Sequence, residues 1–173
     1  NGNEDVTLSE VPLIAKVNMK ANTVITRELV SQSDEVNTDD VRIQEFNMVT
    51  LPATLEAGDF IDIRLRLPNG VDYIVVAKKE VTIPDVAGVP STDTIEVNMS
   101  EDEILTMSNA IVEAYIMNGS ELYATKYTDP GNQAKSTTTY PVSRDTMDLI
   151  NSDSNIVETA KQALWARYNT DQR

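Results

Sequence analysis

Acidic side chains are the residues of this sequence that could most readily do chemistry. Two carboxylates held in unlike environments can act as acid and base in hydrolysis. Three such pairs lie close together in the chain: Asp39 and Asp40, Asp59 and Asp62, and Glu101 and Asp102. Asp62 falls on the polar face of an alternating strand, and Glu101 with Asp102 falls in the first turn of an expected helix, where negative charge complements the helix dipole. Because no spacing fixes a second acid opposite any of them, we interpret these pairs as structural.

Oxygen-bearing side chains also follow one another in the segment Asn151-Ser152-Asp153-Ser154-Asn155, as they do in calcium loops. The EF-hand pattern further needs glycine at its sixth position and an acid at its twelfth, where this chain has Ile156 and Gln162. We therefore expect no metal site and interpret the segment as a break between two helices.

Composition excludes several classes of function. The 173 residues contain no histidine and no cysteine, which removes serine–histidine–aspartate triads, cysteine nucleophiles and zinc sites built on these ligands. The formal net charge of −14 would repel nucleic acid and anionic lipid. No apolar run approaches the roughly 20 residues that span a bilayer. We expect no cofactor, and a binding or scaffold protein instead of an enzyme.

Basic residues are concentrated on one expected hairpin. Arg64, Arg66, Lys78 and Lys79 are four of the fourteen basic residues of this acidic chain. With Tyr73 they form a candidate partner-binding patch. The alternative, which stays open, is that alternation on a half-exposed sheet produces the same polar face without any partner.

The hairpin itself, over residues 60–79, is the clearest local pattern in the chain. Apolar and polar residues alternate on both sides of the sequence Pro68-Asn69-Gly70. A type I turn with a left-handed glycine bulge uses all three residues, whereas a two-residue Asn-Gly loop would put proline where an N–H should close the turn. The three-residue loop predicts two pairs: Arg66 opposite Asp72 on one face, and Leu65 opposite Tyr73 on the other.

The remaining patterns predict an α+β protein with two lobes. Residues 83–93 contain two prolines and a glycine and are interpreted as a linker. After the linker come a strand at 94–99, a helix begun by the capping box of Ser100 and Glu103, and a strand at 121–127, spaced as in a βαβ crossover. A loop at 128–141 and helices beginning near Ser143 and Ser154 complete the chain.

The first lobe resembles a known family. Its most specific parts are the sequences VITREL at residues 24–29 and LEAGDFIDI at residues 55–63, followed by the hairpin. In this order they resemble the SAF domain, which occurs in antifreeze-type proteins, sialic acid synthases, FlgA-like flagellar chaperones and CpaB/RcpC-like pilus assembly proteins. Asn22 stands where family members usually have glycine, and asparagine adopts the same left-handed conformation at modest cost.

The resemblance implies a fold, a function and a location. The expected fold is a β-clip (SAF-like) domain of short strands at residues 10–84, with a smaller α/β lobe and C-terminal helices at 94–173. The expected function is that of a non-enzymatic accessory protein for bacterial pilus or envelope-appendage assembly, which binds protein components of the assembly machine. The expected location is extracytoplasmic. Because the chain begins at Asn1 and not at Met, we also expect that an N-terminal segment, either a signal peptide or a membrane anchor, is absent from this sequence. A carbohydrate- or cell-wall-binding module, with tyrosines stacking on sugars, is the alternative.

Overall fold

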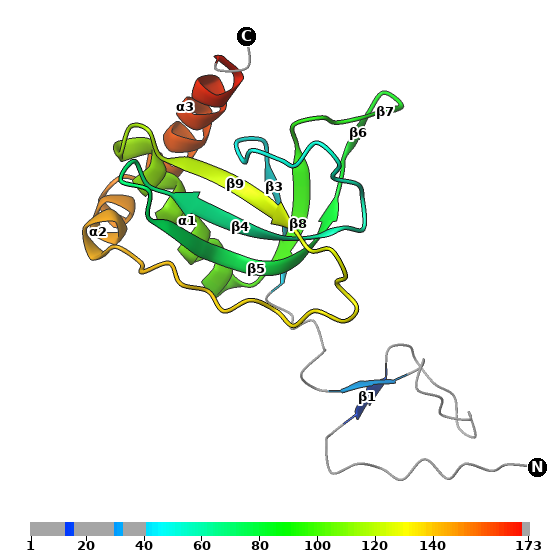
Figure 1. The fold of residues 1–173 in the computed structure, drawn as a ribbon. Helices are drawn as coiled ribbons and strands as arrows, with labels where there is room; N and C mark the ends of the chain where they lie inside the picture. Colours follow the sequence, from blue (N-terminus) through cyan, green and yellow to red (C-terminus); the bar gives the residue numbers. More distant parts are fainter. Residues whose placement is uncertain (1–12, 16–29, 33–40, 171–173) are drawn as a thin grey trace, which may run out of the picture. The chain divides into compact units, whose positions relative to one another are not determined.

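The structure, a computed structural model, describes residues 13–15, 30–32 and 41–170. Contacts divide the chain into two units, Asn1–Asp40 and Val41–Arg173. In the first unit, β1 (Leu13–Ala15) pairs antiparallel with β2 (Val30–Gln32) (Figure 1). The motif at residues 24–29, Asn22 and the Asp39–Asp40 pair lie outside the described residues.

A five-stranded sheet forms the framework of the second unit. Its strands, in spatial order, are β3 (Arg42–Phe46), β8 (Ile95–Met99), β5 (Asp72–Thr82), β4 (Phe60–Arg66) and β9 (Glu121–Lys126). Each neighbouring pair is antiparallel. Together with the three helices, this sheet gives the α+β class that the sequence predicts.

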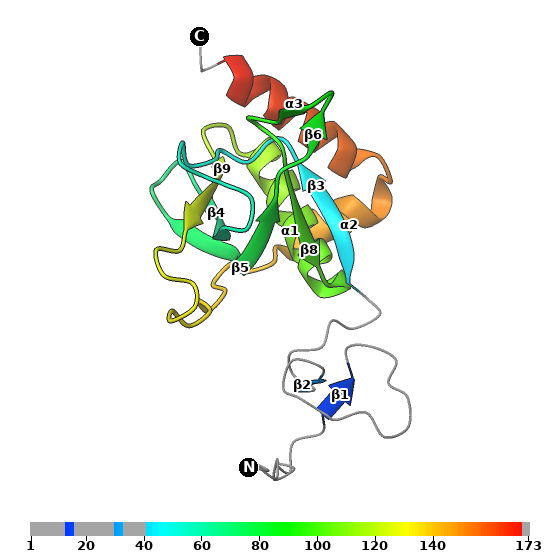
Figure 2. The ribbon, with the colours of Figure 1, turned by 90° about the vertical axis from the view of Figure 1, so that its right-hand side faces the viewer.

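The two edges of this sheet meet at one point. Shortly after β3 ends, the N–H of Thr50 donates to the carbonyl of Leu122, and the N–H of Ala124 donates to the carbonyl of Thr50, both at 2.9 Å. These bonds form a parallel bridge between Thr50 and Tyr123 of β9. The sheet is therefore curved and nearly closed (Figure 2).

Three helices pack on the sheet and on one another. They are α1 (Glu101–Ile116), α2 (Arg144–Ser152) and α3 (Ile156–Thr170). The predicted capping box is confirmed, because the Ser100 side chain accepts from the N–H of Glu103 while the Glu103 side chain accepts from the N–H of Ser100. Ser143 caps α2 as predicted. In the described part of the chain, no helix combines the length and the apolar character needed to cross a membrane.

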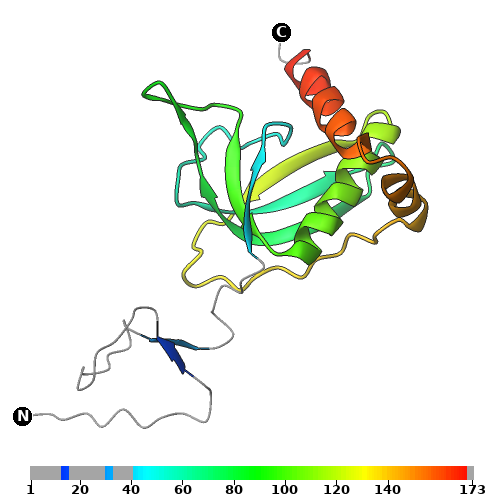
Figure 3. The same ribbon diagram turned by 180° about the vertical axis from the view of Figure 1, so that it is seen from behind.

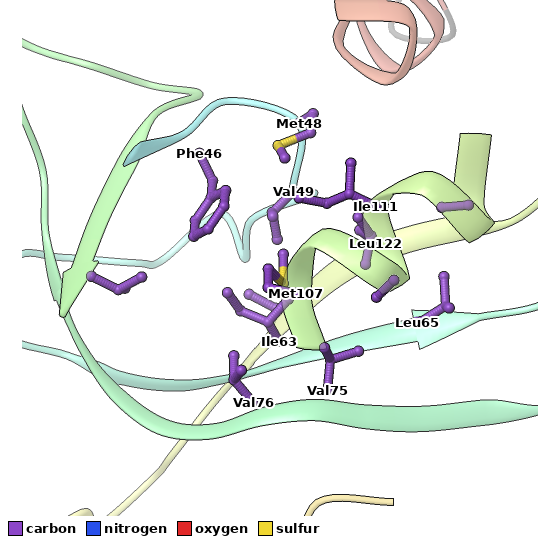
Figure 4. Packing of buried hydrophobic residues seen from close by; sticks show 14 of the residues in the cluster. Phe46, Met48, Val49, Ile63, Leu65, Val75, Val76, Met107, Ile111 and Leu122 are labelled. Atoms are coloured by element: carbon purple, nitrogen blue, oxygen red, sulfur yellow. The ribbon is translucent and has the colours of Figure 1, made fainter. Parts of the chain in front are cut away.

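The core lies between the sheet and α1, which sits against the sheet's inner face (Figure 3). Ile61, Ile63 and Leu65 alternate along β4 and are fully buried. Figure 4 shows Met107 and Ile111 of α1 among the side chains of the sheet. Burial of large apolar side chains at about 25 cal/mol per Å² is the main stabilising contribution here.

Residues 128–143 form a strap of irregular backbone that runs alongside β5 (Figure 1). The loop predicted at 128–141 is therefore confirmed. The strap bonds to β5 at Ile74, whose carbonyl accepts from the N–H groups of Thr139 and Tyr140. The Ile74 N–H in turn donates to the Thr139 hydroxyl at 2.9 Å. The strap thus satisfies the part of β5 that β8 leaves unpaired.

The structure divides the chain between Asp40 and Val41, and not at the linker expected over residues 83–93. Strands from both expected domains, 10–84 and 94–173, lie in one sheet and share one core. The expected linker is a small hairpin, β6 (Asp85–Val86) with β7 (Val89–Pro90), that connects β5 to the adjacent strand β8. Alternation identified the strands, but it does not identify their neighbours.

The predicted βαβ crossover is also wrong. β8 and β9 are separated by β5 and β4 in the sheet. Three successive antiparallel pairings make β9 antiparallel to β8. A strand–helix–strand spacing is compatible with a crossover but does not require one.

Candidate partner-binding surface

The predicted register of the hairpin is confirmed. Arg66 pairs with Asp72, and Leu65 pairs with Tyr73. Gly70 has φ of 88°, the left-handed conformation that the bulge requires. Because Leu65 is fully buried, its neighbours Arg64 and Arg66 project from the opposite, outer face of the sheet.

Arg64 and Arg66 are held by acids of the same face. Arg64 Nε lies 3.0 Å from an oxygen of Asp72, closer than the 3.7 Å of the expected Arg66–Asp72 pair. Arg66 also pairs with Glu121 at 3.2 Å and lies 4.4 Å above the Tyr123 ring. The Tyr123 hydroxyl donates to Asp72. The two arginines therefore belong to a neutralised network within the protein.

Asp72 is the carboxylate that both arginines of this network contact. Partial burial raises the pKa of Asp72, but hydrogen bonds from Tyr123 and Arg64 lower the pKa more, so it lies below its ordinary value. The carboxylate stays ionised between the two arginines, and the network keeps its charge balance at neutral pH.

The two lysines of the candidate patch lie elsewhere. Lys79 is only 15% exposed and forms an ion pair with Glu103 at the start of α1, 2.5 Å away. The Lys78 ammonium donates to the carbonyl of Gln133 in the strap at 2.6 Å and lies 5.8 Å from the centre of the Tyr127 ring. Lys78 and Lys79 thus connect the sheet to the strap and to α1, respectively.

Tyr73 lies on the inner side of the sheet, opposite Leu65, and its ring meets the Tyr140 ring edge-on at 6.0 Å. Tyr123 lies on the outer face, across from Arg64. Tyr127 is almost fully buried. The structure therefore brings Arg64 and Arg66 together but not the whole set of five, and the tyrosines form no common face on which a sugar could stack.

Asp62 differs from its predicted setting. It lies on the same outer face as the arginines, but it is only 5% exposed. One oxygen accepts from the backbone N–H of Lys78 at 2.8 Å and from the Tyr127 hydroxyl at 2.7 Å. Tyr127 is in turn bonded to Ser136 of the strap. The strap covers this carboxylate, which alternation along a strand cannot indicate.

Lys78 has φ of 46°, which is unusual for a residue other than glycine. It lies in β5, next to the irregular pairing of Ile61 and Ile63 with this strand. An irregular strand leaves an N–H without a ladder partner, and Asp62 accepts that N–H. The cluster of Asp62, Lys78 and Tyr127 thus stabilises a strained backbone and anchors the strap.

A second cluster anchors the other end of the strap on α1. The Tyr140 hydroxyl donates to Asn109 at 2.6 Å and also contacts Glu113. Asn109 is fully buried and bonds both the carbonyl and the N–H of Ser143. Burial, and then the neighbouring Glu113 carboxylate, raise the pKa of Tyr140. The phenol therefore stays a neutral donor.

Two large grooves lie on the described surface. The first, of about 470 Å³, lies between α1, β5 and the strap, and its acids are Asp102 and Glu103. Glu103 is already engaged by Lys79 and by the helix cap. Among residues 13–15, 30–32 and 41–170, no three acids lie close enough to hold a metal ion.

The second groove, which we name the β3–α3 groove, has a volume of about 600 Å³. It is lined by Glu45, Asn47, Glu158, Lys161, Gln162, Trp165 and Ala166. Sequence patterns do not predict this groove, because the edge position of β3 and its distance from α3 depend on the tertiary structure. The only signal was Trp165 at the edge of the apolar stripe of the last helix.

No family model, curated protein or solved structure matches this chain. The fold and the two grooves are therefore interpreted from their own geometry and from the sequence pattern.

Proposed function

We propose that this chain is a non-enzymatic accessory protein, exported across the bacterial cytoplasmic membrane, that assists assembly of a pilus or related envelope appendage by binding its protein components. The observation that carries the proposal is the SAF-like order of motifs over residues 10–84. The hairpin at the end of this pattern has the register expected for it. The proposal includes a β-clip arrangement for the SAF-like part.

The contacts of the acidic residues support a binding function over a catalytic one. Asp62 accepts a backbone N–H and a phenol, Asp59 pairs with Lys126 at 2.9 Å, and Glu103 completes a helix cap. Each has a structural task that accounts for its position. The distribution of the tyrosines over two faces leaves the carbohydrate-binding alternative without a supporting observation.

The proposal is tested in the source organism with an epitope-tagged chain. After reversible crosslinking of intact cells, the tagged protein is purified from the membrane fraction, and crosslinked proteins are identified by mass spectrometry. We expect a pilin, a secretin or another assembly component, and we expect the tag to be digested by protease added to spheroplasts. A tagged, unrelated exported protein is the control.

Two results would contradict the proposal. One is a protein that remains protected from protease until the cytoplasmic membrane is lysed. The other is a set of crosslinked proteins that contains no appendage or secretion component beyond those of the control.

A further inference from the structure

The free edge of β3 is the starting observation. Within residues 41–170, β3 pairs only with β8 and lies at one end of the strand order. Ile43, in the middle of the strand, is 68% exposed. Unpaired edge strands are templates for pairing with another extended segment. β3 carries none of the prolines or lysines that commonly block such pairing.

The β3–α3 groove runs beside this edge and contains an aromatic side chain. Trp165 is 42% exposed. The indole is one of the groups that lower the pKa of Asp93, whose carboxylate accepts from the hydroxyls of Ser91 and Thr94.

Two acids beside the edge, Glu45 and Glu158, favour a cationic partner, and Arg42 is the opposing charge at the start of β3. Glu45 lies directly opposite Glu96 of β8, and like charges in such cross-strand positions are destabilising. Glu158 is exposed on the α3 side of the groove. Among the described residues that line the groove, Lys161 is the only cation, and it lies 3.5 Å from Glu158 and 5.8 Å from the centre of the Phe46 ring.

We propose that an extended, basic segment of a partner protein adds to the free edge of β3 as a further strand. Its basic residues lie across from Glu45, which lines the β3–α3 groove, and the apolar residues that alternate with them contact Trp165 of the same groove. This inference rests on the proposed function and deepens it, because it states what kind of segment an assembly component presents.

The single tryptophan of the chain makes the groove measurable. The probe is the peptide acetyl-(Lys-Val)4-amide, which has no tryptophan or tyrosine, titrated into the full chain at low salt. We expect a saturable change in Trp165 emission. The acidic peptide acetyl-(Glu-Val)4-amide should cause none. No saturable change with the basic peptide at millimolar concentration would overturn the proposal.

Backbone methylation tests strand addition specifically. All lysine N–H groups of an extended peptide point to one edge, and all valine N–H groups point to the other. N-methylation of the set that faces β3 should abolish binding, whereas methylation of the other set should leave binding within about threefold. If both methylated peptides bind equally well, or if neither binds, the peptide is not a strand of this sheet and the proposal is wrong.

Charge reversal tests the location. The variant Glu45→Lys with Glu158→Lys should weaken binding of the basic peptide at least fivefold. The control variant Asp85→Lys with Asp148→Lys changes the net charge by the same amount at exposed positions away from the groove. Equal weakening in both variants would show that only the overall charge attracts the peptide, and would overturn the proposal.

Hydrogen exchange distinguishes other occupants of the edge. The outward amide protons of β3 should exchange quickly in the free chain and slowly with the peptide bound. Slow exchange without peptide, at every protein concentration, would mean that residues 1–40 cover the edge. Protection that rises with protein concentration would indicate a second copy. Either result replaces the proposed partner. The purified chain is used throughout, so failure here is separate from failure of the crosslinking experiment in cells.

Discussion

At the scale of single residues, one buried carboxylate has the largest structural role. Asp62 satisfies the N–H of Lys78, where the backbone is strained, and holds Tyr127 and through it the strap. A buried donor that loses its acceptor costs about 1–3 kcal/mol. Removing this side chain leaves two donors without their partner.

We therefore expect Asp62→Ala to lower the free energy of unfolding by about 2–4 kcal/mol. Tyr127→Phe, which removes one of the two bonds to Asp62 together with the bonds to Ser136, should cost about 1–2 kcal/mol. Urea titration followed by circular dichroism measures both. Asp148→Ala, at an exposed position on α2, is the control and should change stability by less than about 0.5 kcal/mol. Similar values for the Asp62 and Asp148 variants would contradict this role.

A second residue-scale expectation concerns the turn between β6 and β7. Ala87 has φ of 55° and Gly88 has φ of 81°, as both central residues of a type I′ turn require. Asparagine tolerates the left-handed region better than alanine does. Ala87→Asn should therefore raise the free energy of unfolding by about 0.5–1 kcal/mol. Ala53→Asn, exposed and without positive φ, should give no such gain when measured by the same titration.

At the scale of elements, the start of α1 combines a helix cap with an ion pair. Burial raises the pKa of Glu103, but the Lys79 ammonium and the Ser100 N–H together lower it by more than burial raises it. The pKa therefore lies below its ordinary value of 4.5. A carboxyl with a depressed pKa stabilises the fold above its unfolded-state pKa. This contribution disappears as pH falls through the folded-state pKa.

Glu103→Gln should therefore destabilise the protein by about 1 kcal/mol at pH 7, because the pair with Lys79 is lost. The difference from the unsubstituted chain should shrink as pH falls below about 4.5, where the native carboxyl takes up its proton. Urea titrations at pH 7, 5 and 3 provide the measurement. Glu101→Gln, in the same helical turn, is the control, and a pH dependence equal to that of Glu103→Gln would argue against the ion pair.

Sequence patterns predicted the local elements better than their assembly. The Pro68-Asn69-Gly70 turn fixed the hairpin register, and the Ser100–Glu103 box fixed the start of α1, because both signals act within a few residues. The burial of Asp62 and the intervening strands between β8 and β9 depend on segments far apart in the chain. Leu105 and Ile116 match the helical spacing of the apolar residues in α1, yet both are more than half exposed, because no other element within residues 41–170 covers that side of the helix.

The candidate site, too, could be predicted only where it depends on local sequence. Alternation correctly put Arg64 and Arg66 on one polar face of the hairpin. It carried no information on Glu121, which comes from β9 and pairs with Arg66, or on the strap that receives Lys78. The β3–α3 groove depends on which strand is last in the sheet and on where α3 packs, and neither is encoded within a short window of residues.

At the scale of the whole second unit, one sheet and one core join segments on both sides of the β6–β7 hairpin. We expect residues 41–170 to unfold in a single cooperative transition. Native-state hydrogen exchange should give the same free energy of opening for the buried amides of β4 and of α1. Opening of α1 at a much lower free energy than β4 would instead indicate two independent domains.

The hairpin between β5 and β8 is a position at which this fold can accept inserted residues. Its base is fixed by the pairing of Val81 with Val97, whereas Val86 and Val89 at its tip are 70% and 64% exposed. Lengthening the tip would not shift the register below it. An epitope or a small foreign domain grafted at Gly88 would thus project from the molecule and leave the rest of the unit intact, so relatives can vary here in length at little thermodynamic cost.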